Sequence, residues 1–276
     1  MSKAINPLLE ISAVHAEIDD ASLLKDVSLQ VNSGEVLALV GPNGSGKTSL
    51  LKSITGELKI QSGNIKFAGQ ELKQWAPTEL AKGLAVLPQK SVLNFPFTGR
   101  EVVMLGRTPH QSGQKIDNEI VDQVLDYLDA QYLAERLYPR LSGGEQQRIQ
   151  LARVLAQIWQ AEDQEQTNAQ PKLLLLDEPS SYFDLAHQQM LVRLVRKIAA
   201  SNIGVLIVLH DINMALSCAD RVAVMSCGQI AASGKSQEVI TTDLIQQVFS
   251  VEASFIQDPQ SGQQIISLNN AVEARE

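Results

Sequence analysis

A glycine-rich segment between two apolar segments constrains the fold of this chain more than any other feature. Val36–Val40 is a continuous apolar run, which is typical of a strand buried on both faces. Leu50, Leu51 and Ile54 then form one apolar face of a helix that should end before Gly56. The residues that connect the two, through the first turn of the helix, are Gly41, Pro42, Asn43, Gly44, Ser45, Gly46, Lys47, Thr48 and Ser49. The pattern predicts a strand, a tight loop and a helix in direct succession.

This loop has the spacing of a phosphate-binding segment that closes on a Lys-Thr pair. Glycines let successive backbone N–H groups turn toward one anion, and the following helix points its positive end at the same place. Lys47 adds a charge for the β- and γ-phosphates, and the Thr48 hydroxyl can ligate Mg²⁺. A glycine-rich turn with a chance Lys-Thr pair is the alternative, but the flanking strand and helix favour the phosphate site. We therefore predict that the loop binds ATP and Mg²⁺.

Two adjacent carboxylates follow a second buried-strand candidate, Leu173–Leu176. In open α/β sheets, ligands bind at the carboxyl ends of the strands, which is where Asp177 and Glu178 would lie. We expect Asp177 to hold the metal ion through water, and Glu178 to orient or polarise the attacking water. Two surface charges at the end of a strand are the alternative, which the phosphate loop upstream makes the weaker interpretation.

A second glycine-containing helix start lies in Leu141–Arg148. Ser142 is a natural N-cap, and Gly143 and Gly144 expose backbone N–H groups ahead of Glu145. The helix then places Ile149, Ala152, Leu155 and Trp159 on one face. One nucleotide needs two separate cradles only if they face each other between subunits; an ordinary capped turn is the alternative.

The remaining pattern is that of an α/β protein, because short apolar runs alternate with helical patterns. Leu8–His15, Leu24–Val31 and Gly63–Phe67 are shorter and mixed, and predict an antiparallel sheet beside the parallel one. Further expected elements are a strand at Val205–Leu209, helices at Asp117–Ala134 and Glu145–Trp159, and a hairpin of Arg221–Met225 with Gln229–Ala232. Residues from about 90 to 150 lack a convincing strand, so we expect an inserted helical subdomain there. The polar stretch Gln160–Gln170 is expected to be a solvated loop.

The net charge, the apolar runs and the cysteine content exclude some classes of function. The net charge of −8 argues against a general nucleic-acid surface, so no nucleic-acid partner is expected. The longest apolar runs are of strand length and far too short to span a membrane. Cys218 and Cys227 have neither metal-ligand spacing nor the number of a disulfide framework, which indicates a reducing cytosol.

Taken together, the motifs resemble those of the ATP-binding-cassette (ABC) family over nearly the whole chain. The resemblance rests on the ordered set Gly41–Thr48, Gln89, Leu141–Arg148, Leu173–Asp184 and His210. It implies a P-loop NTPase core with an antiparallel β subdomain and an inserted α-helical subdomain, in one ABC domain over residues 1–276. Residues from about 250 to 276 would be a C-terminal extension.

The resemblance also implies roles and partners. Two cassettes would pack head to tail, with each ATP between the phosphate loop of one and the Ser-Gly-Gly helix of the other. Gln89 would sense Mg²⁺ and the membrane partner, Asp184 would lie in the loop crossing the dimer interface, and His210 would be the γ-phosphate switch. The chain would be a homodimeric ATPase on the cytoplasmic face of the membrane. It would drive two permease subunits served by a periplasmic or extracellular binding protein.

Three features of the sequence depart from the family pattern. Glu145 replaces the usual Gln, bulky Tyr182 and Phe183 stand in the dimer loop, and no aromatic residue lies in His15–Ile18 to stack on adenine. We therefore expect His15 or Ile18 to pack on the base, and leave the effect of the dimer loop open.

The cargo cannot be derived from phosphate chemistry, so it rests on resemblance alone. Val102–His110 resembles the importer branch for iron-siderophores, haem and cobalamin, while Leu141–Trp159, Asp184–Gln189 and the Gln-rich insertion resemble its haem-importing members. Haem import is expected, with a ferric siderophore and cobalamin as alternatives. His110 and His187 are expected to be surface histidines and not haem ligands. The segment Asn94–Thr98 could form a groove for a permease helix or a locally packed loop.

Two other classes of function remain as alternatives. A soluble cassette acting on DNA ends or ribosomes generally has a long coiled coil or two tandem cassettes, whereas this chain has one phosphate loop. A catalytically weakened regulatory cassette is disfavoured by the intact Lys47, Glu178 and His210.

Overall fold

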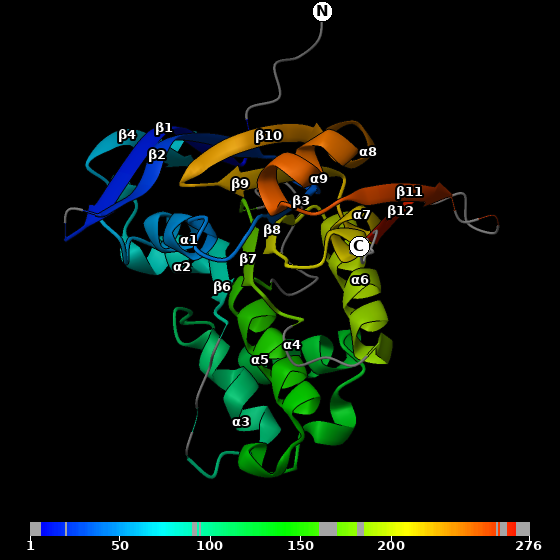
Figure 1. Ribbon diagram of the computed structural model, residues 1–276. Helices are drawn as coiled ribbons and strands as arrows, with labels where there is room; N and C mark the ends of the chain where they lie inside the picture. The colour runs from blue at the N-terminus through cyan, green and yellow to red at the C-terminus, as the bar shows by residue number, and fades with distance from the viewer. Residues whose placement is uncertain are drawn as a thin grey trace, which may run out of the picture.

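A six-stranded sheet forms the centre of the molecule (Figure 1). The computed structural model describes residues 7–19, 21–89, 93, 95–159, 170–180, 185–257, 259 and 264–268, with the side chains of residues 185 and 186 excepted. The strand order is β10-β9-β3-β8-β7-β6, parallel apart from β10. The strands are β3 (Val36–Val40), β6 (Leu84–Leu87), β7 (Leu173–Asp177), β8 (Gly204–Val208), β9 (Arg221–Ser226) and β10 (Gln229–Lys235). The predicted hairpin is confirmed as β9–β10, with Cys227 and Gly228 at positive φ in its turn.

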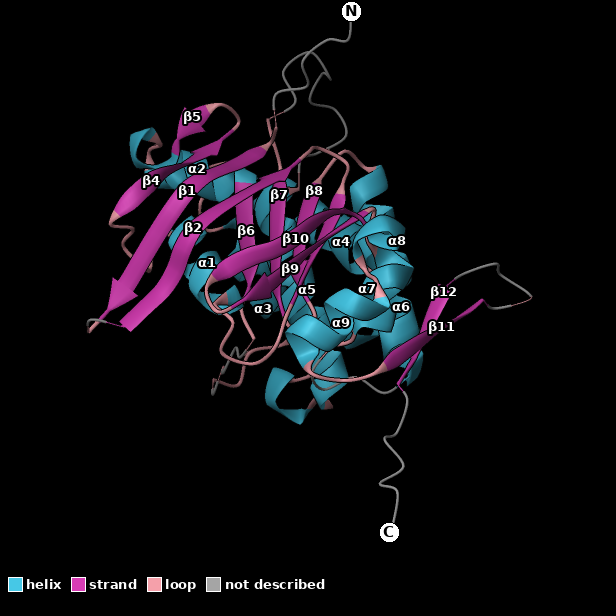
Figure 2. Ribbon diagram, turned by 45° about the horizontal axis from the view of Figure 1, so that its top comes forward, coloured by secondary structure: helices cyan, strands magenta, loops and turns pink. Residues whose placement is uncertain are grey.

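A second, antiparallel sheet lies beside the first, in the order β2-β1-β4-β5 (Figure 2). Its strands are β1 (Leu9–Ile18), β2 (Ala21–Val31), β4 (Ser62–Phe67) and β5 (Gln70–Glu71). The mixed N-terminal segments therefore pair as predicted. Helix α1 (Lys47–Thr55) packs beneath this sheet and ends at Gly56, while the 3₁₀ turn η1 (Leu72–Gln74) and α2 (Pro77–Gly83) lead into β6.

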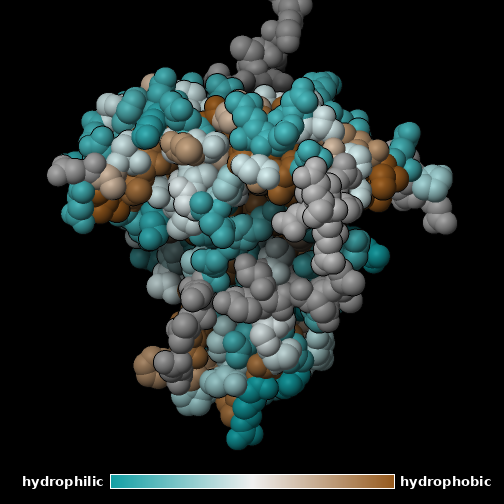
Figure 3. Space-filling model, in the orientation of Figure 1, coloured by the Kyte–Doolittle hydropathy of each residue, from teal (hydrophilic) through white to brown (hydrophobic). Residues whose placement is uncertain are grey.

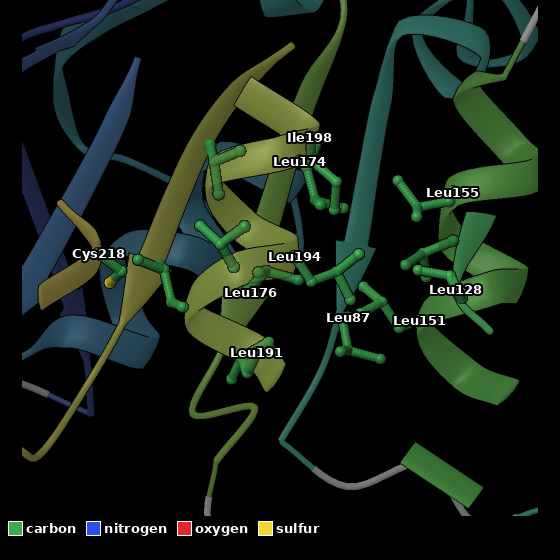
Figure 4. Packing of buried hydrophobic residues seen from close by; sticks show 14 of the residues in the cluster. Leu87, Leu128, Leu151, Leu155, Leu174, Leu176, Leu191, Leu194, Ile198 and Cys218 are labelled. Carbon is green, nitrogen blue, oxygen red and sulfur yellow. The ribbon is translucent and has the colours of Figure 1, made fainter. Parts of the chain in front are cut away.

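The central strands are buried on both faces, which explains their unbroken apolar sequences. In β7, Leu174 and Leu176 face the cluster formed with the helices, whereas Leu173 and Leu175 face the antiparallel sheet and α1. All four side chains are fully buried. Figure 4 shows the helical side of this core, where Leu174 and Leu176 lie near residues of α5 and α6. The phosphate loop leaves the middle of this sheet at β3, so the core holds its base in place.

Helices fill the segment between β6 and β7. They are α3 (Gly99–Met104), η2 (Leu105–Arg107), α4 (Gln114–Tyr127), η3 (Gln131–Leu133), η4 (Tyr138–Arg140) and α5 (Gly143–Ile158). The predicted helix Asp117–Ala134 was too long, because Asp129 takes a left-handed φ of 49° that stops α4 at Tyr127. The predicted solvated loop falls, apart from residue 170, outside the described residues.

The C-terminal part supplies α6 (Leu185–Ala200), α7 (Ile212–Cys218), α8 (Ser236–Val239), α9 (Thr242–Phe249), β11 (Ala253–Gln257) and β12 (Gln264–Leu268). Strands β11 and β12 form a hairpin that projects beside α7, and hydrophobic surface is visible over it in Figure 3. Ile256, Ile265 and Leu268 are exposed there. Of the two cysteines, Cys218 is buried and Cys227 is exposed, and both are free thiols. No helix in the described part of the chain is long and apolar enough to cross a membrane.

Candidate functional site

The phosphate loop connects β3 to α1 and leaves the start of that helix open to an anion. Gly46 is the N-cap residue of α1, with a φ of 103° that favours glycine. A Cβ at this position would lie 2.8 Å from the carbonyl oxygen of Leu23, so a side chain has no room. Among the described residues, no side chain caps this helix start. The first N–H groups of α1 are therefore available to a bound phosphate.

Lys47 is buried within the loop that it follows. Its Nζ donates to the carbonyl oxygens of Gly41 and Pro42, both at 2.9 Å. Burial lowers the pKa of the Lys47 ammonium, and the charges of Glu178 and Asp177 act in the opposite direction. The charge needed for phosphate binding thus lies inside the cradle and faces two carboxylates.

Asp177 lies at the end of β7, and the Thr48 hydroxyl acts to lower its pKa. Its carboxylate is almost fully buried, and Oδ1 has no hydrogen-bond partner among the described residues. Burial raises the pKa of Asp177, and the charge of Glu178 raises it further. Buried Ser45 Oγ also lacks a partner in the described structure. Unpaired buried oxygens are costly, so this set fits a cation at Asp177 and a polar ligand at the loop.

Glu178 is held by two side chains from separate elements. Its backbone has a left-handed φ of 49°, unusual for a residue other than glycine, and its N–H donates to Val208 O at 3.2 Å. Gln89 Nε2 donates to one carboxylate oxygen at 2.5 Å, and His210 Nε2 lies 2.5 Å from the other. Sequence reasoning selected all three residues but did not foresee that Gln89 and His210 share one carboxylate.

A pocket of about 350 Å³ opens over the loop. It is lined by Ser22, Leu23, Lys25, Asn43, Gly44, Ser45, Gly46, Lys47, Thr48, Ser49, Glu178, Cys227 and Gly228. His15 and Ile18 are not among these residues; His15 Nδ1 instead lies 3.1 Å from Ala13 O and from Ser62 Oγ. The turn of the β9–β10 hairpin reaches the pocket because Gly228 N donates to Ser45 O at 3.0 Å. The contribution of Cys227 and Gly228 to the pocket was not predicted, since nothing in the sequence of the turn marks a contact with the distant phosphate loop.

The second helix start, at α5, is closed by its own side chains. Ser142 Oγ accepts from the Glu145 N–H at 3.3 Å, and Glu145 Oε2 accepts from the Ser142 N–H at 2.8 Å. The Ser142 N-cap is therefore confirmed. Arg136 pairs with Glu145 at 2.6 Å. Residues 142–145 do not line the phosphate pocket, so within one chain the two helix starts remain apart.

The opposite end of α5 is capped by the segment that follows α3. Arg107 is buried and donates to Ala156 O at 2.6 Å, while the His110 ring lies 2.7 Å from Gln157 O. A Cβ on Gly106 would lie 2.1 Å from Arg153 O, so only glycine permits this approach. Burial lowers the pKa of His110. His110 is half-buried because its ring satisfies a helix-end carbonyl, so the expectation of a surface histidine holds only in part.

Within residues 95–98, the two aromatic side chains differ in burial. Phe95 is exposed, whereas Phe97 packs against the helical core and its ring centroid lies 5.9 Å from that of Phe95. Asp184, Tyr182 and Phe183 lie outside the described residues.

Comparisons with known proteins agree with this geometry. The family model described as ABC transporter matches residues 24–181. The hemin import ATP-binding protein HmuV of Shewanella denitrificans is 46% identical over 260 residues, covering 94% of this chain and all of the relative. That of Plesiomonas shigelloides is 44% identical over 251 residues, covering 89% and 95%. A metal-chelate type ABC transporter solved in an inward-facing conformation shares the fold, with a TM-score of 0.80 at 24% identity over 96% of this chain and 98% of that one. The chain therefore belongs to the ABC transporter family, as an ATP-binding subunit whose ATPase activity is coupled to transport.

Proposed function

We propose that this chain drives haem import as a homodimer that closes around two Mg-ATP. The observation that carries the catalytic part is the position of Glu178 beside the phosphate loop, held by Gln89 on one side and His210 on the other. A carboxylate fixed in this way is suited to orient a water molecule against the terminal phosphate. His210 and Gln89 are suited to keep Glu178 in that orientation.

Magnesium would be held by Thr48, Asp177 and Gln89. The support is the buried, unpaired Oδ1 of Asp177 and the influence of the Thr48 hydroxyl on the Asp177 pKa, since carboxylate and hydroxyl oxygens are ligands that Mg²⁺ accepts. Bound Mg²⁺ would neutralise phosphate charge. The residues of the loop from Gly41 to Ser49, Lys47 above all, would bind the phosphates themselves.

A second copy of the chain would complete each site with Ser142, Gly143, Gly144 and Glu145, and Asp184 would lie near the contact. Ser142 and Gly143 at the start of α5 are exposed, and residues 142–145 do not line the phosphate pocket of their own chain, which supports a shared site. Within each chain, the helices between about 90 and 150 would act as a subdomain carrying this second helix start, and residues from about 250 onward as an extension.

The cargo proposal rests on relatives, which bear the name hemin import ATP-binding protein. The chain would work at the cytoplasmic face of the cell membrane, bound to two permease subunits that receive haem from a binding protein. The exposed side chain of Phe95 supports a permease contact near the start of the helical segment between β6 and β7.

Reconstituted transport tests the cargo. The chain, assembled in proteoliposomes with its permease subunits, should take up hemin in an ATP-dependent way and leave a ferric siderophore and cobalamin outside. Equal ATP-dependent uptake of a ferric siderophore, with none of hemin, would replace the haem proposal while leaving the ATPase intact.

A further inference from the structure

Asn213 joins the catalytic histidine segment to the C-terminal hairpin. It lies three residues after His210, in the first turn of α7. Its Nδ2 donates to Ile266 O at 3.0 Å, and its Oδ1 accepts from Ile266 N at 2.7 Å. One side-chain amide thus satisfies both backbone groups of a single strand residue.

The hairpin needs this pair because Ile266 is buried in β12. Ile266 lies opposite Phe255 in the register of β11 and β12, and its N–H and C=O point toward Asn213. The amide therefore takes the place that a third strand would have in the ladder. Buried backbone groups left unpaired are costly, so the contact fixes β12 against α7. Figures 1 and 2 both show β12 beside α7.

The other side of the same segment is fixed to the central sheet. Leu209 N donates to Leu39 O at 3.1 Å, and Asp211 Oδ1 accepts from the N–H groups of Asn213 and Met214 at 2.8 and 3.2 Å. His210 lies between these two attachments. The His210 ring lies 2.5 Å from Glu178, and its position is set by the backbone on either side, at Leu209 and Asp211.

We propose that Asn213 is a positioning residue, which uses the C-terminal hairpin to hold the start of α7 and so aims His210 at Glu178. The inference rests on the proposed role of His210. Helix α7 has only seven residues, and its first turn, which carries Asn213, begins two residues after His210. The hairpin is then part of the catalytic framework of the ATPase and not only an appendage.

The test is steady-state ATP hydrolysis by the full chain with Asn213→Ala. We expect kcat to fall about tenfold while the KM for ATP stays within about twofold, because the phosphate loop does not touch this contact. Asn213→Asp keeps the acceptor for Ile266 N but loses the donor for Ile266 O, so its kcat should be intermediate. In the His210→Ala background, Asn213→Ala should have no further effect on kcat.

Matched measurements separate positioning from general damage. Ile256→Thr changes an exposed residue of the same hairpin and should leave kcat unchanged. Amide hydrogen exchange should show lost protection at residues 264–268 in Asn213→Ala. Lost protection with an unchanged kcat, or an equal fall of kcat in the His210→Ala background, would overturn the inference. If His210→Ala itself leaves kcat unchanged, the proposed role of His210 fails instead.

Discussion

The starts of α1 and α5 are chemically similar but differ in what they leave unsatisfied. Both begin with glycine at or next to the cap, and both point backbone N–H groups outward. At α1, Gly46 offers no cap and Lys47 lies buried beside it. At α5, Ser142 and Glu145 close a capping box. The first helix start therefore needs a ligand to satisfy it, whereas the second is stable alone and can wait for a ligand brought by another chain.

Charge sharpens this difference. The carboxylates at the phosphate loop face a buried ammonium, and burial raises the pKa of Asp177. Glu145, in contrast, is stabilised as an anion: the Ser142 N–H lowers its pKa most, burial opposes this, and Arg136 lowers the pKa further. Arg136 thus compensates for a negative charge at a position where the family usually has Gln. This pairing explains how the chain tolerates a carboxylate so near a proposed triphosphate site.

The largest effect is expected at the open helix start. Lys47→Ala removes the buried cation of the phosphate loop, which is proposed to bind the phosphates, so ATP hydrolysis should fall about 10³-fold or more. Steady-state phosphate release measures this. Lys52→Ala, on the exposed side of the same helix, is the matched control and should retain most of the activity.

Glu178→Gln should have the next largest effect. The amide keeps the size of the side chain but cannot accept a proton, so turnover should fall about 10²- to 10³-fold. Binding of a fluorescent ATP analogue should stay within a few-fold of the wild type. Full turnover in this variant would remove Glu178 from its proposed role.

Ser142→Ala tests the closed helix start. Loss of the cap should lower the free energy of unfolding by about 1 kcal/mol, measured by urea denaturation. Helix α1 offers no matching experiment, because no side chain caps its start among the described residues. An unchanged denaturation midpoint would show that the Ser142 hydroxyl is not needed for the start of α5.

Glu145→Gln should have the smallest effect and a defined pH dependence. Gln can keep the box contact but loses the charge facing Arg136, so the unfolding free energy should fall by about 0.5 kcal/mol at pH 7. Because folding lowers the pKa of Glu145 below its ordinary value of 4.5, its stabilisation is present above that pH and lost as the pH falls through the lowered pKa. The gap between the two proteins should therefore close in acid; a gap that is constant with pH would contradict the assignment.

Sequence patterns predicted the features that depend on neighbours along the chain. Buried runs became β3, β7 and β8, and Ser142 became an N-cap, because burial and capping act over a few residues. The contacts that orient Glu178 were not predictable. Gln89 follows β6 and His210 follows β8, and the two side chains come together only when these strands lie in one sheet.

The segment that ends at His110 resembles the iron and haem importers, and the structure shows what part of it does. Gly106, Arg107 and His110 pack on and cap the C-terminal end of α5, so part of that sequence similarity reflects the support of a helix. The residues on which the similarity to this importer branch rests therefore do not all contact a cargo or a permease. The two hydrogen bonds between Asn213 and Ile266 were equally unpredictable from the sequence, because the two residues lie 53 positions apart in the chain.

The central claim is that each nucleotide site is shared between two copies of the chain. Light scattering on Glu178→Gln with Mg-ATP tests it most directly. We predict that the mass doubles from that of the 30.1 kDa chain, and that adding Ser142→Arg keeps it monomeric while ATP-analogue binding to the single chain persists. A mass that stays monomeric in Glu178→Gln, or a dimer that forms equally well with Ser142→Arg, would contradict the account.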